Sequence, residues 1–315
     1  MSWIEISLNT NHEAVDWVCT LLANEISQDD FQIGKYVGDA EQSRENWAFT
    51  ILIYLPHDSQ IHQKVEAIAT ILKPLHRTNL TSELQTFVLD SKPALKNDFS
   101  QVRHIGDRFV IVKDDLDYAP SHDQEIILHL KNSLAFGSGL HPATILSMQL
   151  LERHVQPASQ ALDLGSGSGL LSLAIAKLGA MVLAIDNDPV AVAATEDAVQ
   201  RNQVAELVKV QLASLGSASQ LGHWMGGEGV GQVTAIAAAG QFDLIAANIF
   251  ARVHISLAVE FAAALRANSG ILITAGYTCD RADDVVAAMV AVGLCECDRL
   301  QLDEWVAIAF CLLKK

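Results

Sequence analysis

The sequence predicts an α/β protein in which a doubly wound, seven-stranded sheet follows a smaller ferredoxin-like α+β domain. Three observations predict this fold. A glycine-rich turn joins a strand pattern to a helical pattern within residues 161–171, strand and helix patterns alternate from residue 125 onward, and the first ninety or so residues have the order βαββαβ. We therefore expect domains at 1–92 and 125–315, joined by a polar connector at 93–124.

The composition excludes several classes of protein. Half of the 315 residues are hydrophobic and 18% are charged, which is typical of a globular chain. The formal net charge of −16 disfavours direct nucleic-acid binding. It would attract a basic protein partner, and an ordinary acidic enzyme explains the charge equally well. The five cysteines include no C-x-x-C pair, so neither a disulfide framework nor a metal site is predicted. The sequence has no signal-peptide pattern and no apolar stretch of membrane length, so we expect a cytoplasmic protein.

The first domain is predicted from its hydrophobic periodicity. Apolar residues alternate within 3–8, which indicates a strand, and Thr10-x-x-Glu13 is a capping box that predicts the start of a helix. Two strands, a helix that ends near Pro74 and a last strand follow at 31–38, 47–55, 61–74 and 84–89. This order is ferredoxin-like, a four-stranded sheet with two helices on one face. We find no catalytic constellation in this domain.

Strands and helices alternate after the connector, which itself contains one predicted strand at 108–112. The later strands are expected near 125–130, 160–164, 181–186, 207–212, 242–247, 270–275, 295–301 and 304–312. The helices are expected near 142–155, 169–179, 189–201, 252–267 and 280–292. The last two strands are joined by so few residues that they must be antiparallel. We interpret the Gly-, Ser- and Ala-rich residues 213–241 as an insertion or loop.

The residues that indicate chemistry begin at the glycine-rich turn. Gly165, Gly167 and Gly169 permit positive φ and let a ligand approach the backbone, with the amides of the following helix start facing it. Asp186 ends the next strand, where a carboxylate can accept hydrogen bonds from ribose hydroxyls. The G-x-G-x-G spacing differs from the G-x-G-x-x-G of dinucleotide sites, and Asp163 suits a ligand with an ammonium and a sulfonium better than a pyrophosphate. S-adenosylmethionine is therefore favoured over an NAD site or a simple tight turn.

Two further segments are expected at the same site. Phe136 and His141 precede a helix start at Pro142, with Thr144 in the first turn. Asn248 follows the fourth core strand, at the edge where doubly wound sheets hold their ligands. Simpler interpretations remain for both, a loop with a helix cap for the first and a turn-forming asparagine for the second.

The motifs together resemble those of one family. The segments AFGSGLHPAT, LDLGSGSGLLSLAIAKLGA, AIDNDP and AANIF are similar to motifs of the ribosomal protein L11 methyltransferase family (PrmA type), which are class I, Rossmann-like methyltransferases. The opening MSWIEI and the pair Glu304-Trp305 match as well, so the resemblance is strong over 134–310 and weak over 1–90. It implies that S-adenosyl-L-methionine is the cofactor. It also implies that a basic ribosomal protein is methylated on lysine side chains, with an N-terminal amine as a second candidate, and that the first domain holds this substrate.

The resemblance also suggests roles for individual residues. It implies cofactor contacts for Thr144, Gly165, Asp186 and Asn248, and a place beside the methyl donor for Phe136 and His141. We add Asp163 and Gly167 to the cofactor loop. For catalysis we expect Asn248 to orient the amine, solvent to deprotonate it, and His141 to be a candidate helper.

Departures from the family pattern at 131–133, in the connector and in the insertion at 213–241 leave the protein substrate open. Three alternatives therefore remain, a methyltransferase acting on another protein or a small amine, an NAD-linked oxidoreductase, and a non-catalytic nucleotide-binding module.

Overall fold

The computed structural model describes residues 2–11, 14–22, 26, 30–37, 47–93, 102–113, 116–130, 141–216 and 233–312. These residues belong to two compact units. One contains the described residues up to 93 and the other contains those from 102 onward. The division falls within the predicted connector, and the strand predicted at 108–112 belongs to the second unit.

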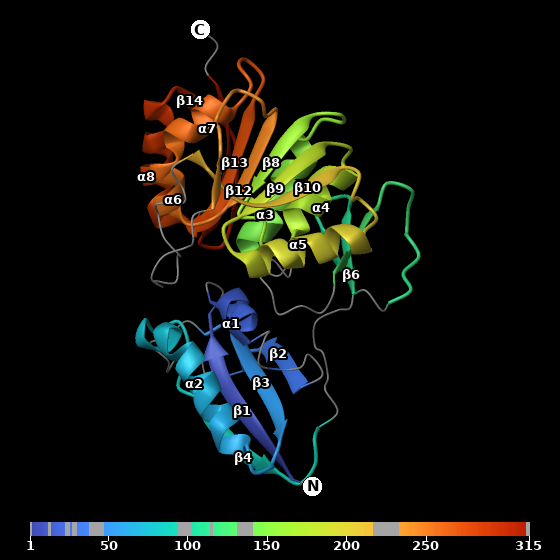
Figure 1. The fold of residues 1–315 in the computed structure, drawn as a ribbon, viewed down its shortest axis with the longest axis vertical. Coiled ribbons are helices and arrows are strands. Elements are labelled where there is room, and N and C mark those ends of the chain that lie inside the picture. The colour runs from blue at the N-terminus through green and yellow to red at the C-terminus, as the bar shows by residue number, and fades with distance from the viewer. Residues whose placement is uncertain are drawn as a thin grey trace. The chain divides into compact units, whose positions relative to one another are not determined.

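The first unit has the ferredoxin-like arrangement that the sequence predicts (Figure 1). Its elements are β1 (Trp3–Thr10), α1 (Val15–Leu22), β2 (Phe31–Lys35), β3 (Phe49–Pro56), α2 (Ile61–Arg77) and β4 (Gln85–Leu89). The antiparallel sheet has the order β2-β3-β1-β4, and alternate residues of β1 are buried. Helix α2 was predicted to end near Pro74 but continues to Arg77. The proline removes only one backbone hydrogen bond, and burial of Leu75 holds the last turn in place.

The second unit is built on an eight-stranded sheet with the order β11-β10-β9-β8-β12-β13-β15-β14. Its strands are β8 (Gln160–Leu164), β9 (Met181–Asp186), β10 (Val208–Leu215), β11 (Thr234–Ile236), β12 (Leu244–Asn248), β13 (Ile271–Thr278), β14 (Leu294–Leu302) and β15 (Trp305–Leu312). The hairpin of β14 and β15 is antiparallel, as predicted. All seven strands predicted for this sheet from residue 160 onward are present, and β11 adds a short eighth beside β10, within the segment interpreted as a loop.

A separate three-stranded sheet corrects one prediction. Its strands are β5 (Val102–Ile105), β6 (Phe109–Lys113) and β7 (Ile126–Leu130). The sequence predicted the last of these as part of the main sheet, which is wrong, because β7 pairs in parallel with β6. Its alternating residues Ile126 and Leu128 are buried in the same core as α3 and α4. Periodicity identifies a half-buried strand but does not identify its pairing partner.

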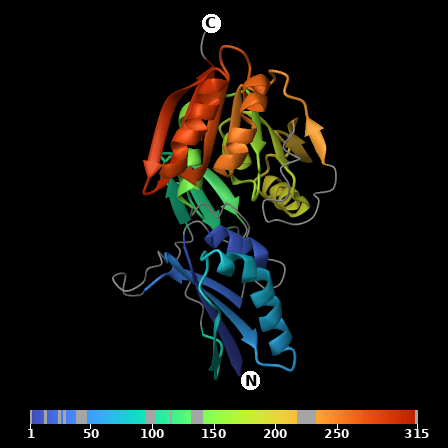
Figure 2. The same ribbon diagram turned by 90° about the vertical axis from the view of Figure 1, so that its left-hand side faces the viewer.

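Helices cover both faces of the main sheet (Figures 1 and 2). They are α3 (Pro142–His154), α4 (Leu170–Lys177), α5 (Pro189–Arg201), α6 (Ala251–Ser256), α7 (Ala258–Ala264) and α8 (Cys279–Ala291). Helices α3 to α5 share one hydrophobic core with one face of the sheet, and α6 to α8 share a second core with the other face. The sheet is therefore doubly wound, as predicted. Among the described residues, no helix has both the length and the apolar character needed to cross a membrane.

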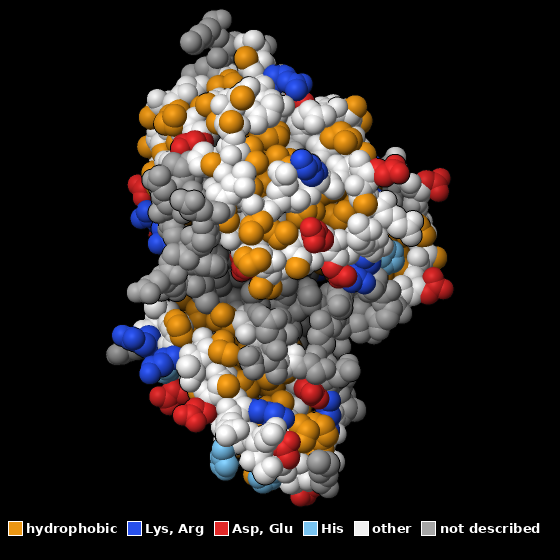
Figure 3. Space-filling view, in the orientation of Figure 1, with side chains coloured by type: hydrophobic (Ala, Val, Ile, Leu, Met, Phe, Trp, Pro, Cys, Tyr) orange, Lys and Arg blue, Asp and Glu red, His pale blue; other side chains and the backbone are white. Residues whose placement is uncertain are grey.

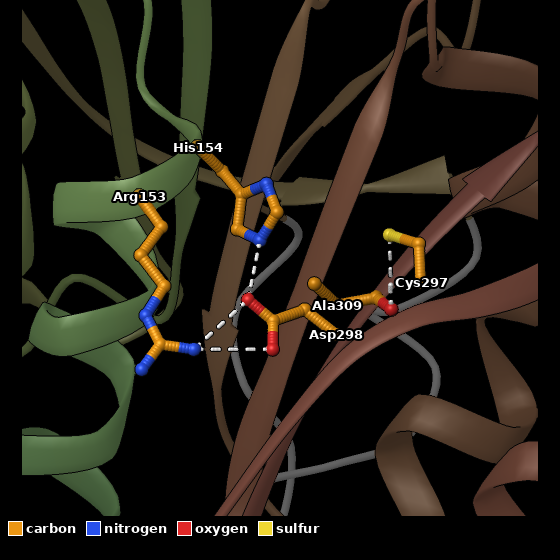
Figure 4. Close-up of polar contacts among 5 residues, drawn as sticks. All are labelled: Arg153, His154, Cys297, Asp298 and Ala309. Atoms are coloured by element: carbon orange, nitrogen blue, oxygen red, sulfur yellow. Dashed lines mark hydrogen bonds and ion pairs between the residues drawn. The ribbon is translucent and has the colours of Figure 1, made fainter.

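The C-terminal end of α3 is tied to the edge of the sheet (Figure 4). Nη1 of Arg153 lies 3.2 Å from both carboxylate oxygens of Asp298, and Nε2 of His154 lies 3.0 Å from Oδ2. Asp298 follows an irregularity in the pairing of β14 with β15. Partial burial acts to raise the pKa of Asp298, but the hydrogen bonds from His154 and Arg153 outweigh it and hold this pKa below its ordinary value.

Candidate active site

The carboxyl ends of β8, β9 and β12 meet at one edge of the main sheet. Strand β8 pairs in parallel with both neighbours, and the register brings Gly165, Asp186 and Asn248 to the same level. The chain winds outward from β8 through β9 and β10 on one side, and from β12 through β13 on the other. This reversal is a topological switch point, at which open α/β sheets bind their ligands. The structure thus brings together three residues that the sequence predicted for one site.

The glycine-rich loop requires its glycines for the backbone conformation. The φ angles of Gly165, Gly167 and Gly169 are +76°, +54° and +82°, in the left-handed region that other residues rarely adopt. A Cβ on Gly165 would also lie 2.7 Å from Cγ2 of Ile249. The hydroxyl of Thr195, in α5, donates a hydrogen bond of 3.1 Å to the carbonyl of Gly167, which ties the loop to α5. The predicted strand, turn and helix are all present.

Asp163 lies fully buried beneath this loop. Its Oδ2 accepts a hydrogen bond of 2.5 Å from the hydroxyl of Ser172 in α4, whereas the buried Oδ1 has no hydrogen-bond partner among the described residues. Burial raises the pKa of Asp163 to about 7; the Ser172 hydrogen bond opposes this rise and the nearby charge of Asp186 adds to it. A buried carboxylate oxygen is normally paired with a cation or a hydrogen-bond donor, and Oδ1 of Asp163 has neither among the described residues. The sequence singled out Asp163 but gave no sign of Ser172, whose role depends on the packing of α4 against β8.

Asp186 braces the loop and the start of α5. Its Oδ2 accepts from the amide of Gly167 and its Oδ1 accepts from the amide of Asp188, both at 3.0 Å. Burial raises the pKa of Asp186, and these amide hydrogen bonds act against the rise. Each carboxylate oxygen has a second lone pair, so the side chain can accept further hydrogen bonds. The predicted contact with ribose hydroxyls is compatible with this geometry and stays a prediction.

Asn248 and Thr144 meet although they are 104 positions apart in the sequence. Nδ2 of Asn248 donates to Oγ1 of Thr144 at 3.2 Å, which fixes which way the amide is oriented. Within the part of the chain that the structure describes, no hydrogen bond reaches Oδ1 of Asn248. Gly276 of β13 keeps this space open, because a Cβ there would lie 2.9 Å from Oδ1. Gly276 was not among the residues predicted for the site, although a glycine inside an apolar strand is a signal of close backbone approach.

His141 caps the N-terminus of α3. Its Nδ1 accepts a hydrogen bond of 3.1 Å from the amide of Ala143, and its ring packs edge-on against Trp305 with centroids 4.2 Å apart. A neutral imidazole that accepts at Nδ1 carries its proton on Nε2, so the lone pair that could accept a proton is already used. The catalytic role predicted for His141 is not tested by this contact and stays a prediction. Phe136 lies outside the described residues.

The residues at this edge fit S-adenosylmethionine, which carries an ammonium, a sulfonium and a ribose. The unpartnered Oδ1 of Asp163 lacks the cation or donor that such a ligand provides. Asp186 retains lone pairs for hydroxyl groups, and the glycines leave the backbone open to a ligand. Among the described residues, no group of His, Cys, Asp and Glu side chains is arranged to hold a metal ion.

The fold and the loop together define a class of protein. A doubly wound sheet whose last strands form an antiparallel hairpin, with an acid and a glycine-rich loop at the switch point, is characteristic of class I S-adenosylmethionine-dependent methyltransferases. Residues 2–312 match the family described as ribosomal protein L11 methyltransferase (PrmA). The chain belongs to this family, which confirms the resemblance seen in the motifs.

Individual relatives match along nearly the whole chain. The sequence is 40% identical over 328 aligned residues to the ribosomal protein L11 methyltransferase of Chloroflexus aurantiacus, covering 98% of this chain and 97% of that protein. It is 36% identical to the protein of the same name in Herpetosiphon aurantiacus, with 98% of each chain covered. Among solved structures, a ribosomal protein L11 methylase from Lactobacillus delbrueckii subsp. bulgaricus is similar with a TM-score of 0.56 and 26% identity, covering 68% of this chain and 99% of that one.

Proposed function

We propose that this chain transfers methyl groups from S-adenosylmethionine to amines of ribosomal protein L11, on lysine side chains first and on an N-terminal amine as the second candidate. The observation that carries the proposal is the arrangement at the switch point, where Asp163, with one unpaired carboxylate oxygen among the described residues, and the oriented amide of Asn248 lie at the ends of adjacent strands. The names of the relatives, which match over the full length of both domains, support the choice of substrate.

Each part of the cofactor has a candidate partner in this chain. When bound, S-adenosylmethionine supplies a methyl group that is already activated by its sulfonium, so no covalent enzyme intermediate is needed. Asp163 and the glycine-rich loop would hold its amino-acid end, and Asp186 would hold the ribose hydroxyls. Thr144 and Asn248 would lie beside the methyl donor, with Thr144 fixing the amide of Asn248.

The reaction requires a neutral amine that is correctly aligned. A lysine with an ordinary pKa near 10.4 needs about 4.6 kcal/mol to be neutral at pH 7, at 1.36 kcal/mol per pH unit. A partly apolar site lowers this requirement because desolvation disfavours the cation. We assign to Oδ1 of Asn248 the acceptance of an amine hydrogen, which aims the nitrogen lone pair, and we assign the deprotonation to solvent. His141 would serve by holding the start of α3 in place.

The protein substrate is expected to be bound by the first unit. The formal net charge of −16 favours encounter with a basic ribosomal protein and disfavours direct contact with nucleic acid. On the face of the second unit drawn in Figure 3, acidic and basic side chains are interspersed with apolar ones. A ribosomal-protein substrate also implies a cytoplasmic location.

The proposal is tested with labelled S-adenosylmethionine and a mixture of ribosomal proteins that includes L11. Label on L11, located to lysine or the N-terminus by mass spectrometry, is the expected result. Label on another protein would contradict the assigned substrate, and cofactor binding without any transfer would indicate a non-catalytic module. Asn248→Ala should lower kcat and kcat/KM together by about 10²-fold, as loss of one positioned hydrogen-bonding group commonly does. Asn248→Asp, which keeps an acceptor oxygen, is the matched comparison.

A further inference from the structure

A buried histidine lies behind the active-site edge and has no role in the reaction described so far. His254, in α6, has no exposed surface. Burial lowers its pKa to about 4, against the opposing effect of the hydrogen bond to the carbonyl of Ala275, so the ring is neutral near pH 7. Nε2 lies 2.9 Å from the carbonyl oxygen of Ala275. Because a carbonyl only accepts, Nε2 carries the ring proton, and no hydrogen bond from the described residues reaches the buried Nδ1.

The carbonyl of Ala275 links this histidine to the active site. The same oxygen accepts the amide hydrogen of Ile249, with the nitrogen 3.0 Å away. Ile249 follows Asn248 directly, and Asn248 lies opposite Ala275 in the register of β12 and β13. His254 and the Asn248–Ile249 turn therefore share one acceptor, whose two lone pairs allow both hydrogen bonds.

The backbone of β13 is irregular at this point. The register between β13 and β15 shifts between Thr274 and Tyr277, as in a β-bulge, a feature that often re-aims residues beside active sites. Gly276, inside the shift, has a φ of +89°, and a Cβ there would lie 2.6 Å from the carbonyl oxygen of Ile249. Regular pairing with β15 is interrupted beside Ala275, and the carbonyl of Ala275 points the other way, toward the Asn248–Ile249 turn and α6, where it accepts from Ile249 and His254.

The ring of His254 is itself held in one orientation. Tyr277 packs against it edge-on, with centroids 5.4 Å apart and an interplanar angle of 76°. The hydroxyl of Tyr277 is fixed in turn by Oγ1 of Thr274, at 2.7 Å. The Nε2–H group is therefore preorganised toward Ala275 rather than free to choose a partner.

We infer that His254 is a positioning residue for methyl transfer, because its hydrogen bond to the carbonyl of Ala275 fixes the Asn248–Ile249 turn and with it the direction of the Asn248 carbonyl. This inference rests on the proposed function, in which Asn248 orients the amine. A purely packing role would favour an apolar side chain, because the unpartnered Nδ1 is a cost that a leucine would not have.

Two substitutions distinguish positioning from packing. Glutamine can place its side-chain nitrogen near the position of Nε2, so His254→Gln should retain kcat to within about threefold. His254→Leu removes the donor and should lower kcat by about tenfold or more, because small misalignments of reacting groups have large effects on rate. Calorimetric affinity for S-adenosylmethionine should change little in either variant, with both assayed below their Tm. Equal kcat values for the two variants would overturn the inference.

A second measurement does not depend on activity. In the wild-type protein, nitrogen-15 NMR of the imidazole should show the neutral Nε2-protonated tautomer throughout the range from about pH 5 to 8. Hydrogen exchange at the Ile249 amide should be faster in His254→Leu than in His254→Gln. An Nδ1-protonated ring, or equal exchange in both variants, would contradict the role of His254. If the wild-type protein transfers no methyl group, the proposed function fails, and the exchange rates still decide whether His254 fixes the turn.

Discussion

The charge state of Asp163 should make the stability of the cofactor-free protein depend on pH. Its folded-state pKa of about 7 lies above the ordinary value of 3.8, because the side chain is fully buried. Between these two pH values the folded protein binds more protons than the unfolded chain, so stability falls as pH rises and becomes level above pH 7 or so. The difference of about three pH units corresponds to about 4 kcal/mol in total, at 1.36 kcal/mol per unit.

Asp163→Asn isolates this effect because it keeps the shape of the side chain and removes the ionisation. Urea unfolding of the cofactor-free protein at several pH values from about 5 to 8 should show the wild type losing roughly 2.5 kcal/mol relative to the variant. Asp188→Asn, at the N-cap of α5, is a matched control and should keep the wild-type slope. Parallel pH profiles for wild type and Asp163→Asn would refute the conclusion that this carboxyl holds a proton.

The same carboxyl should couple cofactor binding to pH. A cationic ligand favours the ionised form of Asp163, so binding should release a proton below about pH 7 and tighten as pH rises through that value. Calorimetry in buffers with different ionisation enthalpies measures the proton release directly. In Asp163→Asn the affinity should be weaker and nearly independent of pH over this range, and an unchanged pH dependence would assign the proton to another group.

Three further outcomes are expected. Asp186→Ala should weaken S-adenosylmethionine binding by about tenfold or more in calorimetry, since a charge-assisted hydrogen bond contributes roughly 1.5–3 kcal/mol; unchanged affinity would remove Asp186 from the cofactor site. Gly165→Ala should lower the Tm and reduce cofactor binding, because its φ of +76° strains any other residue and the added Cβ would lie 2.7 Å from Ile249; a wild-type Tm would contradict this. Asp298→Asn should lower the Tm near pH 7 by loosening the end of α3. Because the pKa of Asp298 is depressed, the stability it contributes is lost as pH falls below about 3.8, and a Tm difference that persists in acid would argue against an ionic contribution.

Local patterns accounted for most of the fold. Alternating and helical periodicity identified the elements of both units, and the glycine-rich turn identified the switch point, because these features depend on residues close together in the sequence. The pairing of β7 with β6 could not be found in this way, since the alternation of Ile126 and Leu128 indicates a half-buried strand but not the strand with which it pairs. The continuation of α2 past Pro74 was missed because its last turn depends on tertiary burial of Leu75.

The active-site residues also fall into two groups, those that local sequence patterns identified and those whose roles depend on tertiary contacts. Asp163, Gly165 and Asp186 could be singled out because their residue types at strand ends have few structural explanations. Ser172 and Thr195 were not predicted, because serine and threonine are common residues, and the contact of the predicted Thr144 with Asn248 appears only in three dimensions. Ser172, in α4, donates a hydrogen bond to Asp163. Thr144 precedes the glycine-rich loop in the sequence and accepts a hydrogen bond from Asn248, which follows the loop.

Three of the seven buried side-chain atoms that have no partner among the described residues lie at or behind the active-site edge. Among the buried side-chain atoms without a partner in the described residues are Oδ1 of Asp163, Nε1 of Trp305 and Nδ1 of His254. The first lies under the glycine-rich loop, the second belongs to the ring that packs on His141, and the third lies behind the turn that holds Asn248. Each lowers the stability of the cofactor-free protein, and a sequence selected for stability alone would replace it with an apolar group. The unpaired Oδ1 of Asp163 is explained if this edge of the sheet is shaped to bind a ligand at some expense of stability.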